Sequence, residues 1–210
     1  VNSVRVGAGY QFASGTTLYA HYRKGKGSYK DPTAGAATGD FTEHETDLQL
    51  TWPITVKTAV DARIGNLSRS NDVSKQNDFS GVVGSAAVRW DITGKTRLVA
   101  GYNRDLSASG FGSGGNVQSD RFYLGPIWKA TAQVALNARY EHVNRDWKNV
   151  PAGTTGAGRN ESFQALSVGV DWEPRRWLAV SGYVRSEKQD SNLNPGYRNT
   201  SIGAAAKAYF

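Results

Sequence analysis

The chain has 210 residues, 39% of them hydrophobic, and its mean hydropathy is −0.52. No apolar run approaches the roughly 20 residues that a membrane-spanning helix needs, which excludes a helical membrane protein. The absence of cysteine excludes disulfides, thiolate catalysis and cysteine-based zinc sites. The net charge of +7 is spread along the chain without a basic cluster, so we expect no nucleic-acid partner.

Alternation of apolar and polar residues begins near the amino terminus and recurs throughout. Val4, Val6 and Ala8 alternate with Arg5 and Gly7, which is the period of a β-strand with one apolar and one polar face. The same pattern predicts about eleven strands, at 4–12, 18–23, 45–52, 57–64, 84–91, 97–103, 122–128, 134–141, 166–172, 177–187 and 197–210.

Short and long connections alternate between these strands. Tight turns are predicted at 13–15, 53–55, 93–95 and 173–176, and long polar loops at 25–40, 68–77, 107–116, 150–158 and 189–196. Pro126 cannot donate to a sheet ladder, so we place it near the turn end of its strand. Strands of ten to twelve residues with this rhythm predict an all-β fold, an antiparallel transmembrane β-barrel.

Aromatic residues gather beside the short turns and at the carboxy terminus. In a membrane barrel they would form a girdle at one membrane interface. A soluble β-sandwich or β-solenoid is the alternative, but such a protein would bury its tryptophans at mid-strand. The predicted girdle consists of Trp52, Trp90, Trp128, Trp172, Trp177 and Phe210.

The strand count leads to a prediction about the whole protein. Bacterial barrels of one chain have an even number of strands and begin in the periplasm, whereas eleven strands are visible here. We therefore expect residues 1–210 to be a single barrel domain that lacks one or more upstream strands of a barrel with 12 or more.

The polar faces carry the candidate functional residues. If the apolar faces meet lipid, the alternate positions line a lumen rich in arginine. The predicted lumen residues are Arg5, Arg23, Arg63, Arg89, Arg97, Arg139, Arg185, Lys207, Asp47, Asp61, Glu141 and Asp171.

Several segments resemble a known family. RYEHVNRD (139–146), VDWEPRRWL (170–178), YVRSEKQDSN (183–192), YRNTSI (197–202) and WDITGKTRLV (90–99) are similar to hairpins of the β-barrel porin family that includes EpsL-type proteins of exopolysaccharide gene clusters. The resemblance runs from about residue 78 onward, and Ala208 departs from it where a bulkier apolar residue is commoner. It implies a Gram-negative outer-membrane pore linked to polysaccharide synthesis or export, without catalytic residues or cofactors.

These observations favour a pore over two other functions. We expect passage of an exopolysaccharide or other polar solutes, with outer-membrane lipid, lipopolysaccharide, polysaccharide and periplasmic export proteins as partners. The alternative is a non-conducting structural barrel, or a receptor or adhesin that uses its long loops. An enzyme is disfavoured because Glu141 and His142 are neighbours in a strand and so face opposite sides, and because His44 lies close to a long loop. No metal site is expected.

Overall fold

Eleven β-strands make up the computed structural model, which describes residues 2–28, 40–72, 75, 78–108, 115–154 and 156–209. The predicted loop residues 29–39, 73–74, 76–77, 109–114 and 155, and Phe210 of the predicted girdle, lie outside the described residues. The strands are β1 (Asn2–Gln11), β2 (Thr17–Gly27), β3 (Phe41–Thr55), β4 (Thr58–Asn71), β5 (Phe79–Asp91), β6 (Thr96–Ala108), β7 (Asn116–Lys129), β8 (Val134–Lys148), β9 (Asn160–Arg175), β10 (Leu178–Ser191) and β11 (Tyr197–Ala208).

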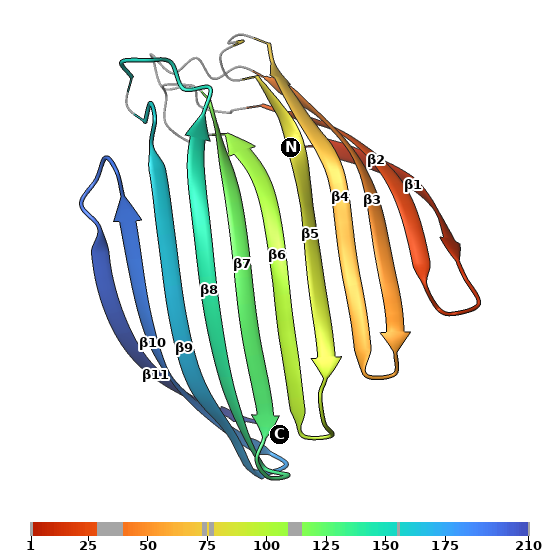
Figure 1. Ribbon diagram of the computed structural model, residues 1–210, viewed down its shortest axis with the longest axis vertical. Coiled ribbons are helices and arrows are strands. Elements are labelled where there is room, and N and C mark those ends of the chain that lie inside the picture. The colour runs from red at the N-terminus through yellow and green to blue at the C-terminus, as the bar shows by residue number, and fades with distance from the viewer. Residues whose placement is uncertain are drawn as a thin grey trace.

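All eleven strands form one antiparallel sheet in chain order, from β1 at one edge to β11 at the other (Figure 1). The predicted all-β antiparallel class and the predicted alternation of short and long connections are thereby confirmed. No helix among the described residues is long and apolar enough to cross a membrane.

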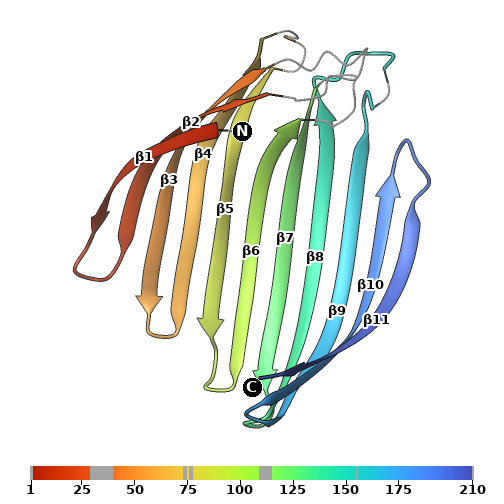
Figure 2. The ribbon, with the colours of Figure 1, turned by 180° about the vertical axis from the view of Figure 1, so that it is seen from behind.

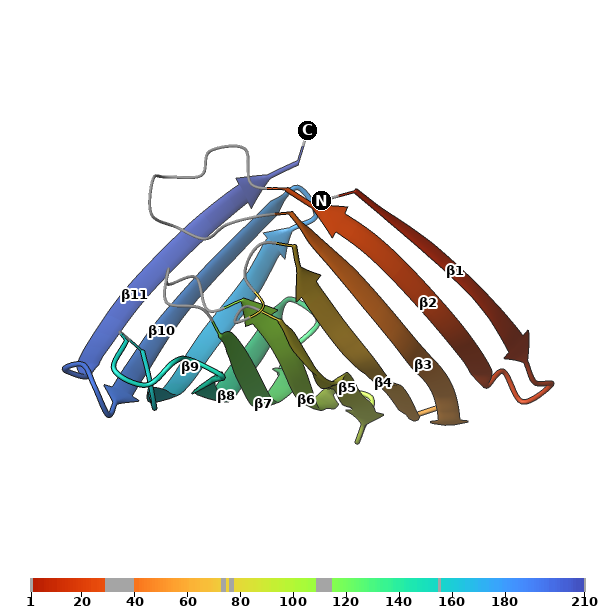
Figure 3. The same ribbon diagram turned by 90° about the horizontal axis from the view of Figure 1, so that it is seen from above.

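The sheet is bent along its width. Seen from behind and from above, edge strands β1 and β11 turn toward the same side of the central strands (Figures 2 and 3). Among the described residues the two edges do not pair with each other, so the sheet is open. The expectation of further strands in the whole protein stays a prediction.

Threonine hydroxyls fix several of the short turns. Thr93 Oγ1 accepts hydrogen bonds from the backbone N–H groups of Lys95 (3.1 Å) and Thr96 (3.0 Å). Thr131 closes the β7–β8 turn in the same way. The hydroxyl substitutes for a backbone acceptor and lets the chain reverse within a few residues. In the first turn, Gly15 has a φ of 81°, in the left-handed region of backbone conformation that residues with a side chain rarely adopt.

Two predicted turns were placed too early. Strand β3 continues through Pro53 to Thr55, and strand β9 continues through Pro174 to Arg175, so the reversals fall at 56–57 and 176–177. Each proline lies within three residues of its strand end, and the β3–β4 register shifts between Pro53 and Thr55. A proline near a strand end removes one ladder donor and does not end the strand.

Pro126 behaves partly as predicted. It lies three positions before the end of β7 and pairs in register with Leu98 of β6. On the β8 side the ladder passes from Leu124 directly to Ile127, which leaves Gly125 and Pro126 unmatched. The missing N–H therefore interrupts one ladder only.

Several strands run further into the predicted loops than the apolar alternation indicated. β2 reaches Gly27, β3 begins at Phe41, β4 reaches Asn71 and β8 reaches Lys148. In these extensions the outer face is polar, and the inner face mixes charged residues with buried apolar ones such as Phe41 and Leu67, so the apolar-out alternation disappears from the hydrophobicity pattern. Ion pairs such as Arg69 to Glu43, at 2.5 Å, join adjacent strands there instead. The predicted boundaries at residues 25, 45, 68 and 141 were therefore wrong.

Strand register keeps the two faces of the sheet chemically distinct. In every pairing, odd-numbered residues lie opposite odd-numbered ones and even opposite even, apart from the shift at Thr55 and an irregularity at Leu178. All strands therefore present their odd positions on one face, here called the inner face, and their even positions on the other, the outer face.

Candidate functional site

The inner face lies on the concave side of the sheet. Arg5 on β1 contacts Asp47 on β3 at 3.1 Å, across the whole width of β2. Such contacts form where side chains converge, which happens inside a curve. Asp47 is only 2% exposed, whereas Val4 on the outer face is 70% exposed.

A first group of charges occupies the inner face of β1 to β4. Besides Arg5, Asp47 accepts from His21 (3.3 Å) and pairs with Arg63 (3.3 Å). Further along these strands, Glu45 pairs with Arg23 and Arg63. We call Arg5, His21, Arg23, Glu43, Glu45, Asp47, Arg63 and Arg69 the first charge cluster; its members come from four strands.

In the first charge cluster the acids are more buried than the bases. Glu43, Glu45 and Asp47 are all buried, and each contacts at least two cationic side chains. Arg69 also lies over the ring of Phe41, 4.0 Å from its centroid. Buried carboxylates are tolerated because every one of them is paired.

A second group lies on the inner face of β7 to β10. Glu141 is 3.4 Å from Arg121 and 3.7 Å from Arg139. Glu161 similarly contacts two arginines, and Glu187 accepts from Arg185 at 3.1 Å. We call Arg121, Arg139, Glu141, Arg145, Arg159, Glu161, Arg185 and Glu187 the second charge cluster; it holds five arginines and three glutamates.

Every predicted lumen residue lies on the inner face. The first charge cluster brings together four of them, Arg5, Arg23, Asp47 and Arg63. The second brings together three, Arg139, Glu141 and Arg185. The others lie outside the clusters, with local contacts for Arg97 (Asp91, 2.6 Å), Asp61 (Thr51, 2.9 Å), Asp171 (Asn137, 2.7 Å) and Lys207 (over the Tyr209 ring). Arg89 sits on the same face opposite Ala59 and Val99. Whether this face lines a conducting lumen stays a prediction.

Sequence reasoning missed about half of the charged groups. Glu43, Glu45 and Arg69 fell at or beyond the predicted strand ends, and Arg121, Arg145 and Glu161 bordered predicted loops. Their odd numbering was the available signal, because it continues the parity of the polar positions in the alternating part of each strand.

The outer face is apolar near the short turns and polar beyond. Trp52, Trp90, Trp128 and Trp172 all lie on it within four residues of a strand end and are 45 to 48% exposed. Trp177 lies in the β9–β10 turn and is more exposed still. Further from the short turns, the outer face of each strand carries two to four apolar side chains, followed by polar residues such as Asn66 and Gln164. This is the layout of a lipid-facing band, although a membrane role for the individual tryptophans stays a prediction.

The histidines disfavoured as catalytic bases are separated from the neighbouring carboxylates. His44 lies on the outer face, where its Nδ1 is 2.7 Å from the Tyr22 hydroxyl, while Glu43 and Glu45 point inward. His142 lies on the outer face opposite Phe122 and Gln164. Among the described residues, no group of three histidine or acidic side chains could hold a metal ion.

Comparison with known proteins agrees with this geometry. A family model described as "Putative beta-barrel porin 2" matches residues 2–210. No match is found among curated proteins.

Solved outer-membrane proteins share the fold at low sequence identity. The outer membrane channel DcaP of Acinetobacter baumannii is 13% identical with a TM-score of 0.73, over 98% of this chain and 62% of that protein. The siderophore receptor PirA of Pseudomonas aeruginosa is 13% identical with a TM-score of 0.61, over 96% of this chain and 37% of that protein. A loop-deletion mutant of OmpT from Vibrio cholerae is 16% identical with a TM-score of 0.54, over 98% of this chain and 62% of that protein. These likenesses confirm the predicted outer-membrane barrel fold, and the chain spans about 62% of the length of DcaP and OmpT.

Proposed function

Because the chain belongs to the Putative beta-barrel porin 2 family of the bacterial outer membrane, we propose that it forms a pore whose inner face guides polar and anionic solutes. The barrel does no covalent chemistry in this proposal, and no cofactor takes part. Conduction needs many weak binding positions along a wall, because a tight site would stop the flow.

The observation that carries the proposal is the excess of arginine over acid in the second charge cluster. Five arginines share three glutamates, and the Arg121 and Arg139 contacts to Glu141 are long, at 3.4 and 3.7 Å. The guanidinium groups of Arg121 and Arg139, held in this loose way, keep donors for a passing carboxylate or hydroxyl. A wall of this charge raises the local concentration of anions.

The solute class proposed is a polysaccharide or its acidic fragments. The resemblance to EpsL-type proteins supports export of an exopolysaccharide, and periplasmic export proteins would then deliver the polysaccharide to the pore. On the outer face, lipid would cover the apolar band and lipopolysaccharide the polar positions above it.

Planar-bilayer recording of the full gene product tests the proposal. We expect a steady open current with anion selectivity, blocked by acidic oligosaccharides more than by neutral ones. Arg139→Ala should lower both the selectivity and the block, because it removes one cation from the second charge cluster. Arg97→Ala should do so less, because Arg97 lies beside a short turn and is paired with Asp91 at 2.6 Å.

The same recording decides the alternative. A correctly folded, heat-modifiable barrel that passes no current would overturn the pore. The first charge cluster, in which each buried acid is already paired, would then be a purely structural element, and the protein a structural barrel or receptor.

A further inference from the structure

A hollow in the inner face lies beside the second charge cluster, on β8, β9 and β10. It has a volume of about 390 Å³ and is lined by Asn137, Ser167, Gly169, Asp171, Ser181, Gly182, Tyr183 and Arg185. Ligand pockets in proteins begin at about 300 Å³. We propose that this hollow is a binding position for a single acidic sugar unit, a pyranose ring that carries a carboxylate.

The hollow exists because small residues surround one tyrosine. Strand register places Tyr183 in a row with Gly169 on one side and Gly203 on the other. The rows above and below contain mostly small side chains, among them Ser167, Ser201, Ser181, Ala205 and Ala135. Tyr183 is therefore the one aromatic side chain in these three rows of the hollow, and small side chains hold most of the positions around it.

Tyr183 lies flat on the neighbouring strand. A Cβ added to Gly203 would be 2.4 Å from Tyr183 Cε1, which shows that the ring occupies the space over this glycine. One ring face covers Gly203, while the side chain stays 49% exposed. The phenol thus offers an apolar, electron-rich surface to the concave side of the sheet, and the C–H groups on one face of a pyranose can stack on such a surface.

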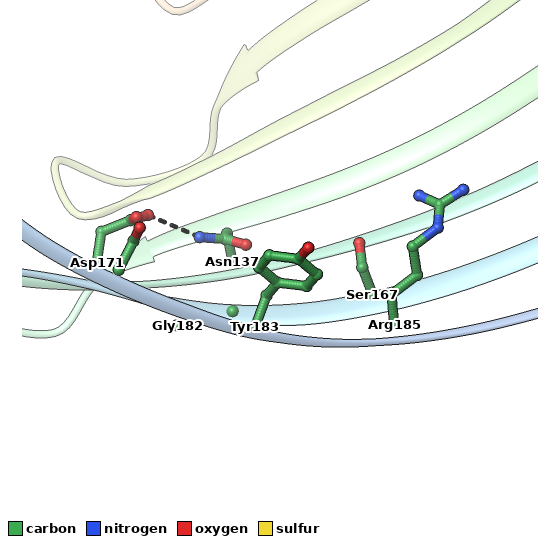
Figure 4. Close-up of a pocket in the computed structure, with 8 residues that line it drawn as sticks. Asn137, Ser167, Asp171, Gly182, Tyr183 and Arg185 are labelled. Carbon is green, nitrogen blue, oxygen red and sulfur yellow. Dashed lines mark hydrogen bonds between the residues drawn. The ribbon is translucent and has the colours of Figure 1, made fainter. Parts of the chain in front are cut away.

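Polar groups of opposite charge stand on either side of the ring. Figure 4 shows Asp171 and Asn137 at one end and Ser167 and Arg185 at the other, with Tyr183 between them. Asn137 Nδ2 donates to Asp171 Oδ2 at 2.7 Å, which orients a carboxylate that can accept hydrogen bonds from sugar hydroxyls.

Arg185 supplies the recognition of a carboxylate. Its Nε donates to Glu187 at 3.1 Å, and no partner of its terminal nitrogens is found among the described residues. Those nitrogens can bind a carboxylate with two parallel hydrogen bonds. Arg139 lies in the same row, opposite Ser167, and adds positive potential. The row of Asp171 and the row of Arg185 are four residues apart along a strand, about 13 Å, which suits one sugar ring with its substituents.

This inference deepens the proposed function by naming a solute unit, but binding can be measured without conduction. The experiment is calorimetric titration of the full gene product in detergent with three probes: glucuronate, glucose and benzoate. We expect glucuronate to bind in the millimolar range, glucose more weakly, and benzoate least, because benzoate lacks hydroxyls for Asp171 and Asn137.

Variants then test each group. Tyr183→Ala should weaken glucuronate binding about 3- to 10-fold, and Tyr183→Phe should keep it within about twofold, because the ring face remains. Arg185→Gln should weaken glucuronate about tenfold and leave glucose unchanged. Tyr140→Ala, a loss of the same side chain from the outer face of β8, should change neither.

The outcomes separate the two proposals. Equal binding of benzoate and glucuronate, or unchanged binding in Tyr183→Ala and Arg185→Gln, would overturn the sugar site whether or not the barrel conducts. If Tyr183→Ala fails to fold, Arg185→Gln and Gly203→Ala, which tilts the ring without removing it, still decide. Selective binding of glucuronate by a barrel without current would support the site and overturn the pore.

Discussion

At the scale of the residue, Asp47 shows how the inner face tolerates charge. Its carboxylate is almost fully buried and meets Arg5, His21 and Arg63, which come from three other strands. Arg5 and Arg63 remain partly exposed, so water screens part of the attraction. Asp47 on β3 therefore links its neighbours β2 and β4, and also β1, which does not pair with β3.

We predict that Asp47→Asn destabilises the barrel by about 1–3 kcal/mol, because two arginines lose their shared counter-charge. Reversible urea unfolding in lipid vesicles measures the change. Asp61→Asn is the matched control, since Asp61 is exposed and accepts one hydrogen bond from Thr51, which an amide oxygen can still accept. Equal destabilisation by both variants would show that Asp47 has no special role.

At the scale of the element, the β-hairpins depend on turns closed by side chains. Thr93 and Thr131 each accept two backbone hydrogen bonds, in the turns between β5 and β6 and between β7 and β8. The turns in turn fix the register, and the register fixes which side chains face inward.

Thr93→Ala should therefore cost about 0.5–1.5 kcal/mol of unfolding free energy, the usual net value of such hydrogen bonds. Thr93→Ser keeps the hydroxyl and should stay close to the parent. The same vesicle assay compares the two, and a serine variant as unstable as the alanine one would assign the effect to the methyl group instead.

At the scale of the whole molecule, the two faces of the sheet meet different solvents. Ala86 and Ala87 are neighbours at mid-strand in β5, and the register puts Ala86 opposite Ala62 on the outer face and Ala87 opposite Asp61 on the inner face. In a membrane barrel the outer position meets hydrocarbon and the inner one a polar interior.

Ala86→Arg should destabilise the inserted protein by about 2–4 kcal/mol, the cost of arginine near the bilayer midplane. Ala87→Arg should cost far less, because the new cation faces Asp61. Comparing folding of both variants into vesicles measures the difference, and equal effects would contradict the assignment of the faces.

Local sequence patterns predicted the strand class, the number of strands, the alternation of turns and loops, and the face of each residue within the predicted strands. These follow from local physics, because the period of two is a property of each strand and survives any tertiary arrangement. The predicted inner residues, from Arg5 to Lys207, therefore share one face.

The strand ends and the two charge clusters, in contrast, depend on how the strands pair in the folded protein. Glu43 and Arg69 lie 26 residues apart, and their ion pair appears only when β3 and β4 are in register. The hollow around Tyr183 likewise needs Gly203, Gly169 and Asn137 to meet from three other strands. Pairing between distant segments sets these contacts, and hydrophobic alternation carries no information about which polar residues will meet.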